Sequence, residues 1–345
     1  MVEAVIAFAP GRVNLIGEHT DYNGGLALPF AIDRGVTVRG AVSGGLTVHV
    51  HATDLGAHDA FDLGRPQPTE GWRAFARGAV AELRAAGAPL VGSRLEISGT
   101  VPSGAGLSSS AALEVALCLA LLALCDTPPP DRQELARLCS RIENEWVGAP
   151  TGLLDQLASL YGEADRALLI DFRSLRVTPV PLLLPDCRLV ALHSGERHTN
   201  AAGDGGYATR RDECARACEA LGVATLSEAT ESGAEQLPEP LRSRTLHVTG
   251  ENERVHQAAA ALQAGDAARV GALLDASHAS LRDLFEVSTP AVERAVQTLR
   301  SAGALGARLI GGGFGGHVLG LLPARAAVPD GAIEVRPGPG ASIVG

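Results

Sequence analysis

Four side chains near the start of the chain could together bind a polyhydroxylated ligand. They are Arg12, Glu18, His19 and Asp21, in a turn-rich stretch directly after a short apolar segment. The guanidinium supplies several donors and the two carboxylates supply acceptors, and the hydroxyl groups of a sugar need both. We therefore interpret the stretch as a ligand-binding loop. The alternative, a solvated loop in which the two acids only pair with Arg12, fits so dense a pattern less well.

A second stretch suited to chemistry is the glycine- and serine-rich segment 102–111, which follows a predicted strand and opens a predicted helix. Glycines expose consecutive backbone N–H groups, and the N-terminus of a helix adds unsatisfied donors and partial positive charge. This geometry suits a phosphate group. Taken alone, however, such a segment is more often only a helix cap.

The third stretch contains an acid in apolar surroundings. Asp155 follows a Gly/Pro turn and lies among Leu153, Leu154 and Leu157, where an ionised carboxylate is unfavourable unless it is paired. We interpret it as a candidate general base, and capping of the next helix is the alternative. An arginine such as Arg12 beside it would keep the carboxylate ionised and would stabilise charge on a transferring phosphoryl group. Proton acceptance and orientation of the reacting hydroxyl both remain open as its main role.

The composition excludes several classes of function. The net charge is −10 without any basic run, which argues against a nucleic-acid partner because phosphate backbones are bound by clustered cations. All 29 basic residues are arginines, so a Walker A loop and a Schiff-base lysine are both excluded. Phosphate must therefore be bound by backbone N–H groups, a metal ion or arginine.

The sequence predicts neither a signal peptide nor a membrane partner. The N-terminus has Glu3 and no positive leader. The longest apolar stretch, 111–125, is interrupted by Glu114 and is shorter than the roughly 20 residues that span a bilayer. We expect a cytoplasmic location, in which the six cysteines stay reduced. Cys214 and Cys218 are one helical turn apart, which is too few ligands for a metal site by themselves.

A length of 345 residues predicts two domains, which we place at residues 1–180 and 181–345. Period-two alternation dominates the first hundred residues and helical periodicity becomes common afterwards, so the expected fold class is α+β. Strands are predicted at 5–9, 26–31, 36–41, 46–51, 95–99, 188–193, 307–310 and 317–322. Helices are predicted at 72–86, 108–124, 131–146, 208–221, 253–264, 268–284 and 290–302.

Together, the motifs resemble those of one known family. Segment 11–22, Gly-Arg-Val-Asn-Leu-Ile-Gly-Glu-His-Thr-Asp-Tyr, resembles the complete galactokinase signature. Segment 102–111 is similar to the family's loop over the ATP phosphates, and 152–156 to the segment around its catalytic aspartate. The six residues 311–316 are similar to its glycine-rich third motif. The resemblance, to galactokinases among the GHMP small-molecule kinases, implies a two-domain fold with a ribosomal protein S5 domain 2-like N-terminal domain and a ferredoxin-like C-terminal domain.

The resemblance implies a role for each matching residue. The implied catalytic residues are Asp155 and Arg12. The implied sugar contacts are Glu18, His19, Asp21, Gly152 and Tyr207. The implied ATP contacts are Trp72 near the adenine and, in the phosphate loop, Gly104, Gly106, Leu107, Ser108, Ser109 and Ser110. Mg²⁺ would be held by Ser110 and Glu143, whose hydroxyl and carboxylate are hard oxygen ligands. For Glu143, surface charge is the alternative.

The implied activity is ATP- and Mg²⁺-dependent phosphorylation of the anomeric C1 hydroxyl of galactose to galactose 1-phosphate. N-acetylgalactosamine and arabinose remain open as sugars, because relatives share the motifs. A non-catalytic sensor of galactose and ATP is a rival from another class, and no obligate protein partner is implied. The chain departs from the family's pattern at two points. His317 stands where the family usually has cysteine, and little sequence precedes the first motif, which leaves open how the edge of the first strand is covered.

Overall fold

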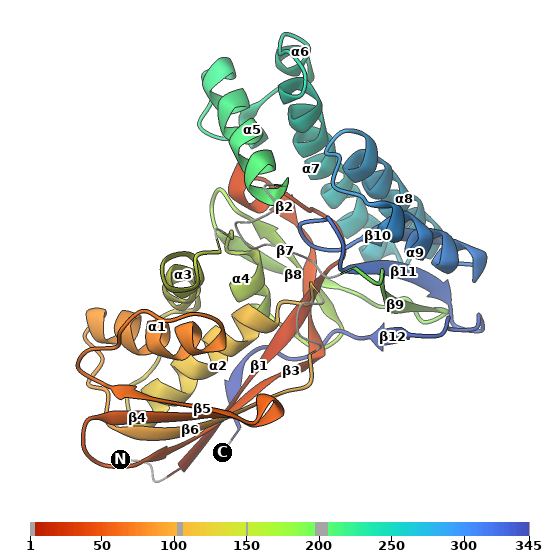
Figure 1. Cartoon of the computed structure of the whole chain (residues 1–345). Helices are drawn as coiled ribbons and strands as arrows, with labels where there is room; N and C mark the ends of the chain where they lie inside the picture. The colour runs from red at the N-terminus through yellow and green to blue at the C-terminus, as the bar shows by residue number, and fades with distance from the viewer. Residues whose placement is uncertain (1–3, 102–105, 150, 197–205, 345) are drawn as a thin grey trace.

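The protein forms two lobes, each built from a sheet and the helices that cover it (Figure 1). A computed structural model describes residues 4–101, 106–149, 151–196 and 206–344. Its strands are β1 (Ala4–Asn14), β2 (Leu26–Ala27), β3 (Pro29–Val42), β4 (Thr47–Ala52), β5 (Ala57–Asp62), β6 (Ser93–Gly99), β7 (Arg166–Asp171), β8 (Arg176–Pro181), β9 (Cys187–His193), β10 (Gly306–Leu309), β11 (His317–Pro323), β12 (Ala332–Val335) and β13 (Ser342–Ile343).

The helices lie mainly in the middle of the chain and in its C-terminal half. The α-helices are α1 (Trp72–Ala85), α2 (Ser109–Leu124), α3 (Arg132–Arg141), α4 (Leu154–Tyr161), α5 (Gly206–Leu221), α6 (Glu231–Ala234), α7 (Leu241–Ala264), α8 (Ala267–Asp283) and α9 (Pro290–Ser301). Short 3₁₀ turns are η1 (Asp21–Asn23), η2 (Thr53–Leu55) and η4 (Leu226–Glu228), and η3 (Ile142–Val147) is a π-helical turn.

Three sheets organise these elements. The first lobe contains a six-stranded sheet in the order β13-β1-β3-β6-β4-β5, and the second contains a four-stranded sheet in the order β10-β11-β9-β12. A small sheet, β2-β7-β8, lies between them in Figure 1. Strands and helices are thus mixed as the sequence predicts, and the α+β class is confirmed. The domain boundary near residue 180 stays a prediction, although the sheets change between β8 and β9.

Two long strands lead from the first sheet into the centre of the molecule. The predicted strand at 5–9 continues as β1 to Asn14, and the predicted strands at 26–31 and 36–41 are largely one strand, β3. The polar pair Asp33 and Arg34 does not end β3, because both side chains retain contact with solvent. The register of β1 shifts between Pro10 and Arg12. Such a bulge re-aims side chains, and Arg12 follows it directly.

The outer edge of β1 is covered by the last strand of the chain. Ala7 is paired with Ile343 and Phe8 with Ser342 in the antiparallel pair β1–β13. This pairing satisfies backbone groups that an open edge would expose. The sequence left this point open, and the structure shows that the C-terminal residues return to the first lobe.

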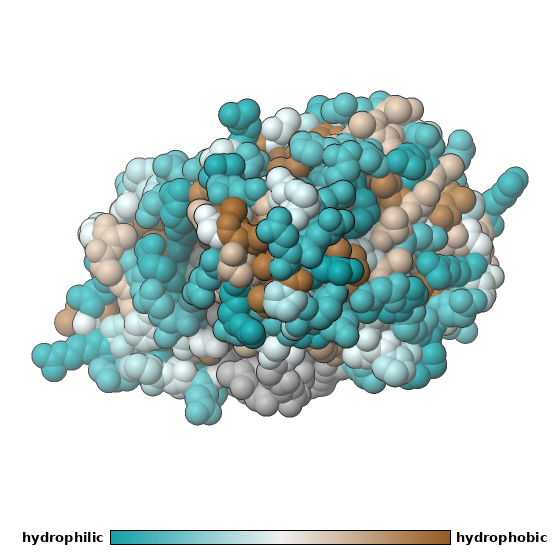
Figure 2. All heavy atoms as spheres, turned by 90° about the horizontal axis from the view of Figure 1, so that it is seen from above, coloured by the Kyte–Doolittle hydropathy of each residue, from teal (hydrophilic) through white to brown (hydrophobic). Residues whose placement is uncertain are grey.

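Helix α2 forms the centre of the first lobe's core. Apart from Ser109, Ser110 and Glu114, its residues are apolar on all sides and most are buried, so the apolar stretch at 111–125 is a buried helix, as predicted. Within the described residues, no helix is long and apolar enough to cross a membrane. The face seen in Figure 2 is mostly hydrophilic, with apolar residues in small groups.

Helix α7 begins twelve residues before its predicted start at 253. The prediction was wrong because buried polar residues interrupt the apolar stripe of this helix. Arg244 donates to Glu213 at 2.7 Å, His247 is 2.8 Å from the Ser280 hydroxyl, and Glu251 accepts from Ser277. Partners elsewhere in the chain thus allow polar residues on a buried helix face.

Candidate active site

A cavity of about 680 Å³ lies where the two lobes meet. Small-molecule sites typically have volumes of roughly 300–1,000 Å³. The predicted site residues that line the cavity are Arg12, Glu18, His19, Asp21, Trp72, Gly106, Ser108, Ser109, Ser110, Glu143, Gly152, Asp155 and Tyr207. Motifs that are far apart in the sequence therefore converge on one cavity.

Two of the predicted phosphate-loop residues are not among these lining residues. Gly104 lies outside the described residues. Leu107 does not line the cavity, because its side chain is buried in a hydrophobic cluster. Its backbone is nevertheless tied to the site, since the carbonyl of Leu107 accepts the N–H of Arg12 at 3.1 Å. The roles of both residues toward ATP remain predictions.

Arg12 and Asp155 form an ion pair in this cavity. Arg12 Nη2 lies 2.8 Å from Asp155 Oδ1, and Arg12 Nη1 donates to the carbonyl of Gly106 at 2.6 Å. The hydroxyl of Ser108 donates to Asp155 Oδ2. The guanidinium thus bridges the candidate base and the candidate phosphate-binding segment, which is where charge would develop during phosphoryl transfer.

A close backbone approach fixes the distance between β1 and the phosphate-binding segment. A Cβ at Gly11 would lie 2.4 Å from the carbonyl oxygen of Leu107, so only glycine fits there. Asp155 is the second residue of α4, and the residue that caps this helix is Leu153, without a side-chain hydrogen bond. The alternative role of Asp155 as a helix cap is therefore excluded.

Glu143 is buried, with only 5% of its surface exposed, which excludes the alternative role of a surface charge. It belongs to η3, and π-helical turns are frequent at functional sites. Burial raises the pKa of Glu143, and the charge of Asp155 raises it further, while hydrogen bonds from Thr151 and Ser110 lower it. A bound cation would favour the ionised form of this carboxyl group.

The donor set at this point suits Mg²⁺. Ser110 and Glu143 both line the cavity, and a hydroxyl with one carboxylate is a common protein contribution to a magnesium–nucleotide complex. Their hydrogen bond brings the two candidate ligands together. Among the residues that the structure describes, no group of three or more His, Cys, Asp or Glu side chains is placed to hold a metal ion.

Glu18 is held in place from both lobes. Glu18 Oε1 accepts the N–H of Gly311 at 2.8 Å and lies 3.4 Å from Arg308 Nη1, while Oε2 accepts from Asn14 Nδ2 at 2.8 Å. Burial raises the pKa of Glu18, and the positive charges of Arg308 and Arg12 lower it. The carboxylate is thus a fixed acceptor at the wall of the cavity.

His19 has a left-handed backbone, with φ of 61°, and both of its ring nitrogens contact protein groups. Nε2 is 3.2 Å from the carbonyl of Gly312 and Nδ1 is 2.8 Å from the hydroxyl of Tyr22. Because a carbonyl only accepts, Nε2 carries the proton and Nδ1 accepts from Tyr22. Tyr207 lies beside this ring, with 5.4 Å between the centroids. Contacts of His19 and Tyr207 with a sugar remain predictions.

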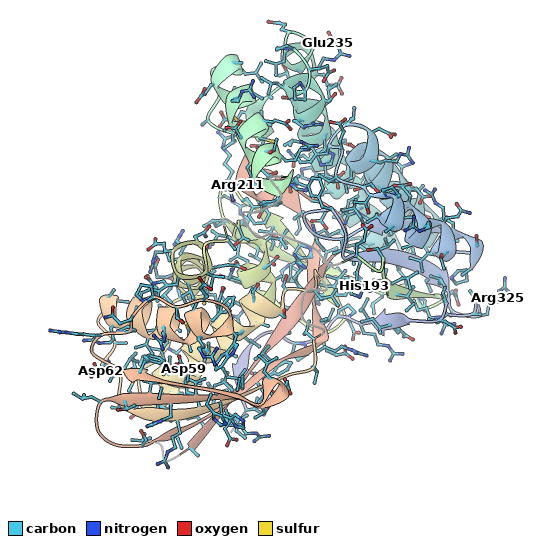
Figure 3. All side chains as sticks on the ribbon, viewed as in Figure 1. Asp59, Asp62, His193, Arg211, Glu235 and Arg325 are labelled. Atoms are coloured by element: carbon cyan, nitrogen blue, oxygen red, sulfur yellow. The ribbon has the colours of Figure 1, made fainter. Side chains whose placement is uncertain are left out.

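Asp21 and Gly152 lie next to each other in the wall of the cavity. Burial raises the pKa of Asp21 to about 6, a backbone hydrogen bond lowers it, and the charge of Asp155 raises it. A Cβ at Gly152 would lie 1.8 Å from Asp21 Oδ2. Gly152 thus provides the space that the Asp21 carboxylate occupies. Arg211, labelled on α5 in Figure 3, exerts a smaller opposing effect that lowers the pKa of Asp21.

The other end of the cavity is apolar. Trp72 and Phe75 of α1 lie there with Val36, Leu113 and Val147. An apolar and partly aromatic lining suits a nucleobase, which supports the predicted location of the adenine near Trp72.

Sequence reasoning missed three residues that organise the site. Arg308, in the strand β10, is fully buried and bonds to the carbonyls of Asn14 and Leu15. Gln156 and Glu114 are fully buried next to Glu143. Glu114 and Arg308 are charged residues within predicted apolar elements, and Gln156 directly follows the candidate base Asp155; these were the signals available. Their partners could not be identified because they are distant in the sequence.

Family models match three parts of the chain. The galactokinase galactose-binding signature matches residues 2–42, the N-terminal domain of GHMP kinases matches 74–163, and the C-terminal domain matches 258–329. The galactokinase of Mycobacterium tuberculosis is 46% identical over 324 residues, covering 92% of this chain and 88% of that protein. The galactokinase of Streptomyces coelicolor is 42% identical, covering 92% and 84%.

Solved structures agree with these matches. The Lactococcus lactis galactokinase complexed with galactose is 31% identical, with a TM-score of 0.90, covering 98% of this chain and 95% of that chain. A mevalonate kinase is 18% identical with a TM-score of 0.71, which shows the shared fold alone. The predicted GHMP kinase fold with its N- and C-terminal domains is therefore confirmed. Its motifs, its cavity and these similarities show that the chain is a sugar kinase and belongs to the galactokinase family of the GHMP kinases.

Proposed function

We propose that this chain transfers the γ-phosphoryl group of ATP to the C1 hydroxyl of D-galactose, giving galactose 1-phosphate and ADP. One observation carries the proposal. The Arg12–Asp155 pair lies in the same cavity as the serines of the phosphate-binding segment and the acids of the sugar signature. A nucleotide bound at the serines and a sugar bound at the signature acids would meet at the Arg12–Asp155 pair. Because both residues are present and paired, the proposal favours turnover over a sensor that only binds.

In the proposed reaction, Asp155 orients the C1 hydroxyl and accepts its proton. Asp155 Oδ1 is paired with Arg12 and Oδ2 accepts from Ser108, so the carboxylate has one fixed orientation. Arg12 neutralises charge on the transferring group. Much of the rate then comes from in-line positioning of the hydroxyl and the phosphoryl group.

Glu18, His19, Asp21, Gly152 and Tyr207 would form the sugar end of the cavity, and Trp72 with Gly104, Gly106, Leu107, Ser108, Ser109 and Ser110 the ATP end. Mg²⁺ would be held by Ser110 and Glu143 and would neutralise phosphate charge. We further propose a cytoplasmic location, and domains at 1–180 and 181–345. No protein partner is part of the proposal.

The proposal is tested by ADP release from the purified chain with ATP and Mg²⁺. The sugar panel contains galactose, glucose, N-acetylgalactosamine and arabinose, with mevalonate as a non-sugar acceptor. Galactose-selective turnover is the expected result. Turnover with another sugar alone would replace the substrate, and galactose binding without ADP release would support the sensor instead.

Substituting Gly152→Ala is expected to raise the KM for galactose by more than about tenfold, which corresponds to about 1.4 kcal/mol. The new Cβ would lie 1.8 Å from Asp21 Oδ2, so the Asp21 side chain must move away from its position at the sugar end. Steady-state kinetics with varied galactose at saturating ATP measure the change. Gly250→Ala in α7 is the matched control, because its Cβ meets only the flexible end of Arg254 at 3.2 Å. Equal KM values for the two variants would contradict the role of Gly152 in leaving space for the Asp21 side chain.

Galactose binding is expected to weaken as the pH falls below about 6. The pKa of Asp21 is raised to about 6, so the carboxylate that accepts sugar hydroxyls becomes protonated there, whereas it is ionised at pH 8. If only the ionised form binds, the dissociation constant rises by about tenfold for each pH unit below the pKa. Calorimetric titrations from pH 5 to pH 8 measure this. The Asp21→Asn variant should bind weakly with a flatter profile. If Asp21→Asn shows the same pH profile of galactose binding as the unchanged chain, the pH dependence belongs to another acid, such as Glu18.

A further inference from the structure

The amide of Gln156 lies between two buried carboxyl groups. Gln156 Nε2 is 3.1 Å from Glu143 Oε2 and 3.1 Å from Glu114 Oε2. A side-chain amide has two N–H donors, so one N–H is directed to each acid. Gln156 is fully buried and follows Asp155 directly in α4.

The contacts of Glu143 are unequal between its two oxygens. Oε2 accepts from the Thr151 hydroxyl at 2.7 Å as well as from Gln156. These two donors use both in-plane lone pairs of Oε2. Oε1 receives neither of them. Ser110, the other candidate ligand of the cation, also forms a hydrogen bond with this carboxyl group, and we assign Oε1 to the cation.

We propose that Gln156 is a positioning residue for the metal ligand Glu143. Together with Thr151 it fixes Oε2, and it thereby presents Oε1 to the cation of the bound nucleotide complex. Glu114 anchors the amide from the opposite side. The inference rests on the proposed function, because it assigns Glu143 to the cation. Partners of this kind orient metal ligands in many proteins, and their loss typically lowers metal affinity by about 10–100-fold.

The placement of the anchor supports this proposal. Glu114 is four residues after Ser110 in α2, so the two lie on one face of that helix. The helix that supplies one candidate ligand thus also supplies the anchor for the other. Glu114 is fully buried, so its contact with the Gln156 amide is shielded from water.

The test measures Mn²⁺ affinity in the presence of a non-hydrolysable ATP analogue, from the electron paramagnetic resonance signal of free Mn²⁺. Gln156→Met keeps the length of the side chain and removes both donors. We expect its Mn²⁺ dissociation constant to rise at least about tenfold, while galactose binding, measured by calorimetry, stays close to that of the unchanged chain. Gln257→Met is the matched control, because Gln257 lies outside the cavity on α7 and bonds to Glu253.

Thr151→Val provides a second variant, since it removes the other donor to Oε2 from a partly exposed residue. It keeps the proposal testable if Gln156→Met does not fold, and its Mn²⁺ affinity is expected to fall severalfold. Mn²⁺ affinity unchanged in the folded variants would overturn the positioning role. Failure of the unchanged chain to bind Mn²⁺ with the analogue, together with no ADP release, would instead overturn the proposed function.

Discussion

Asp155→Asn is expected to lower kcat for galactose by about 10²–10⁴-fold, the usual contribution of a general acid or base. Asparagine has the shape of aspartate, and it can still accept from the Ser108 hydroxyl that bonds to Asp155 Oδ2. It cannot take up the proton of the C1 hydroxyl, and it leaves the Arg12 guanidinium without the ion partner that lies 2.8 Å away. Rates of ADP release at saturating galactose and ATP measure the loss.

The division of the effect between kcat and KM distinguishes the two roles of Asp155. If proton acceptance dominates, kcat falls and galactose affinity changes little, because the substitution leaves Glu18 and Asp21, the acidic residues proposed to bind the sugar, unchanged. If orientation of the hydroxyl dominates, the KM rises as well. Asp212→Asn, at an exposed position in α5, is the matched control and should leave both values unchanged. A loss in kcat smaller than about tenfold would show that Asp155 is not the base.

The parts of the site that the sequence predicted are those carried by local motifs. Arg12, Asp155, Ser110 and Glu143 lie in short segments whose residue types match one chemistry, and all of them line the cavity. Such segments are recognisable because the backbone geometry they need depends on nearby residues. Gly17 of the signature segment 11–22 is an example, since its backbone φ of 101° favours glycine.

The parts that the sequence did not predict depend on contacts between distant segments. The start of α7 was missed because Arg244 and His247 have partners in other helices. The strands β7 and β8 were missed too, because exposed and polar residues obscure the period-two pattern in β8. The hydrogen bond from Ser108 to Asp155 joins residues 47 positions apart. No local pattern encodes such a pair.

Arg308→Met is expected to lower the free energy of unfolding by about 3–5 kcal/mol, the usual cost of removing one partner from a buried ion pair. The Arg308 side chain is fully buried, and its Nη1 donates to the carbonyls of Asn14 and Leu15 at 3.0 and 3.1 Å. Without it, these carbonyls and the Glu18 carboxylate lose a shared donor, and buried acceptors without donors are costly. Urea unfolding followed by circular dichroism measures the change. Arg325→Met, at an exposed arginine labelled in Figure 3, is the control.

The same substitution is expected to weaken galactose binding, because Arg308 connects the two lobes at the sugar end. Arg308 belongs to β10 of the second lobe. Its partners lie in the first lobe: Asn14 is the last residue of β1, and Leu15 and Glu18 follow that strand. Arg308 lowers the pKa of Glu18 against the effect of burial. Its loss also removes a donor that lies 3.4 Å from Glu18 Oε1, so the carboxylate is less well fixed for sugar hydroxyls. Adding galactose should therefore raise the urea midpoint less in Arg308→Met than in Arg325→Met, since at a given galactose concentration L the stabilisation, RT ln(1 + L/Kd), falls as Kd rises. An equal galactose-dependent shift in the two variants would restrict Arg308 to a structural role and leave Glu18 positioned by Asn14 and Gly311 alone.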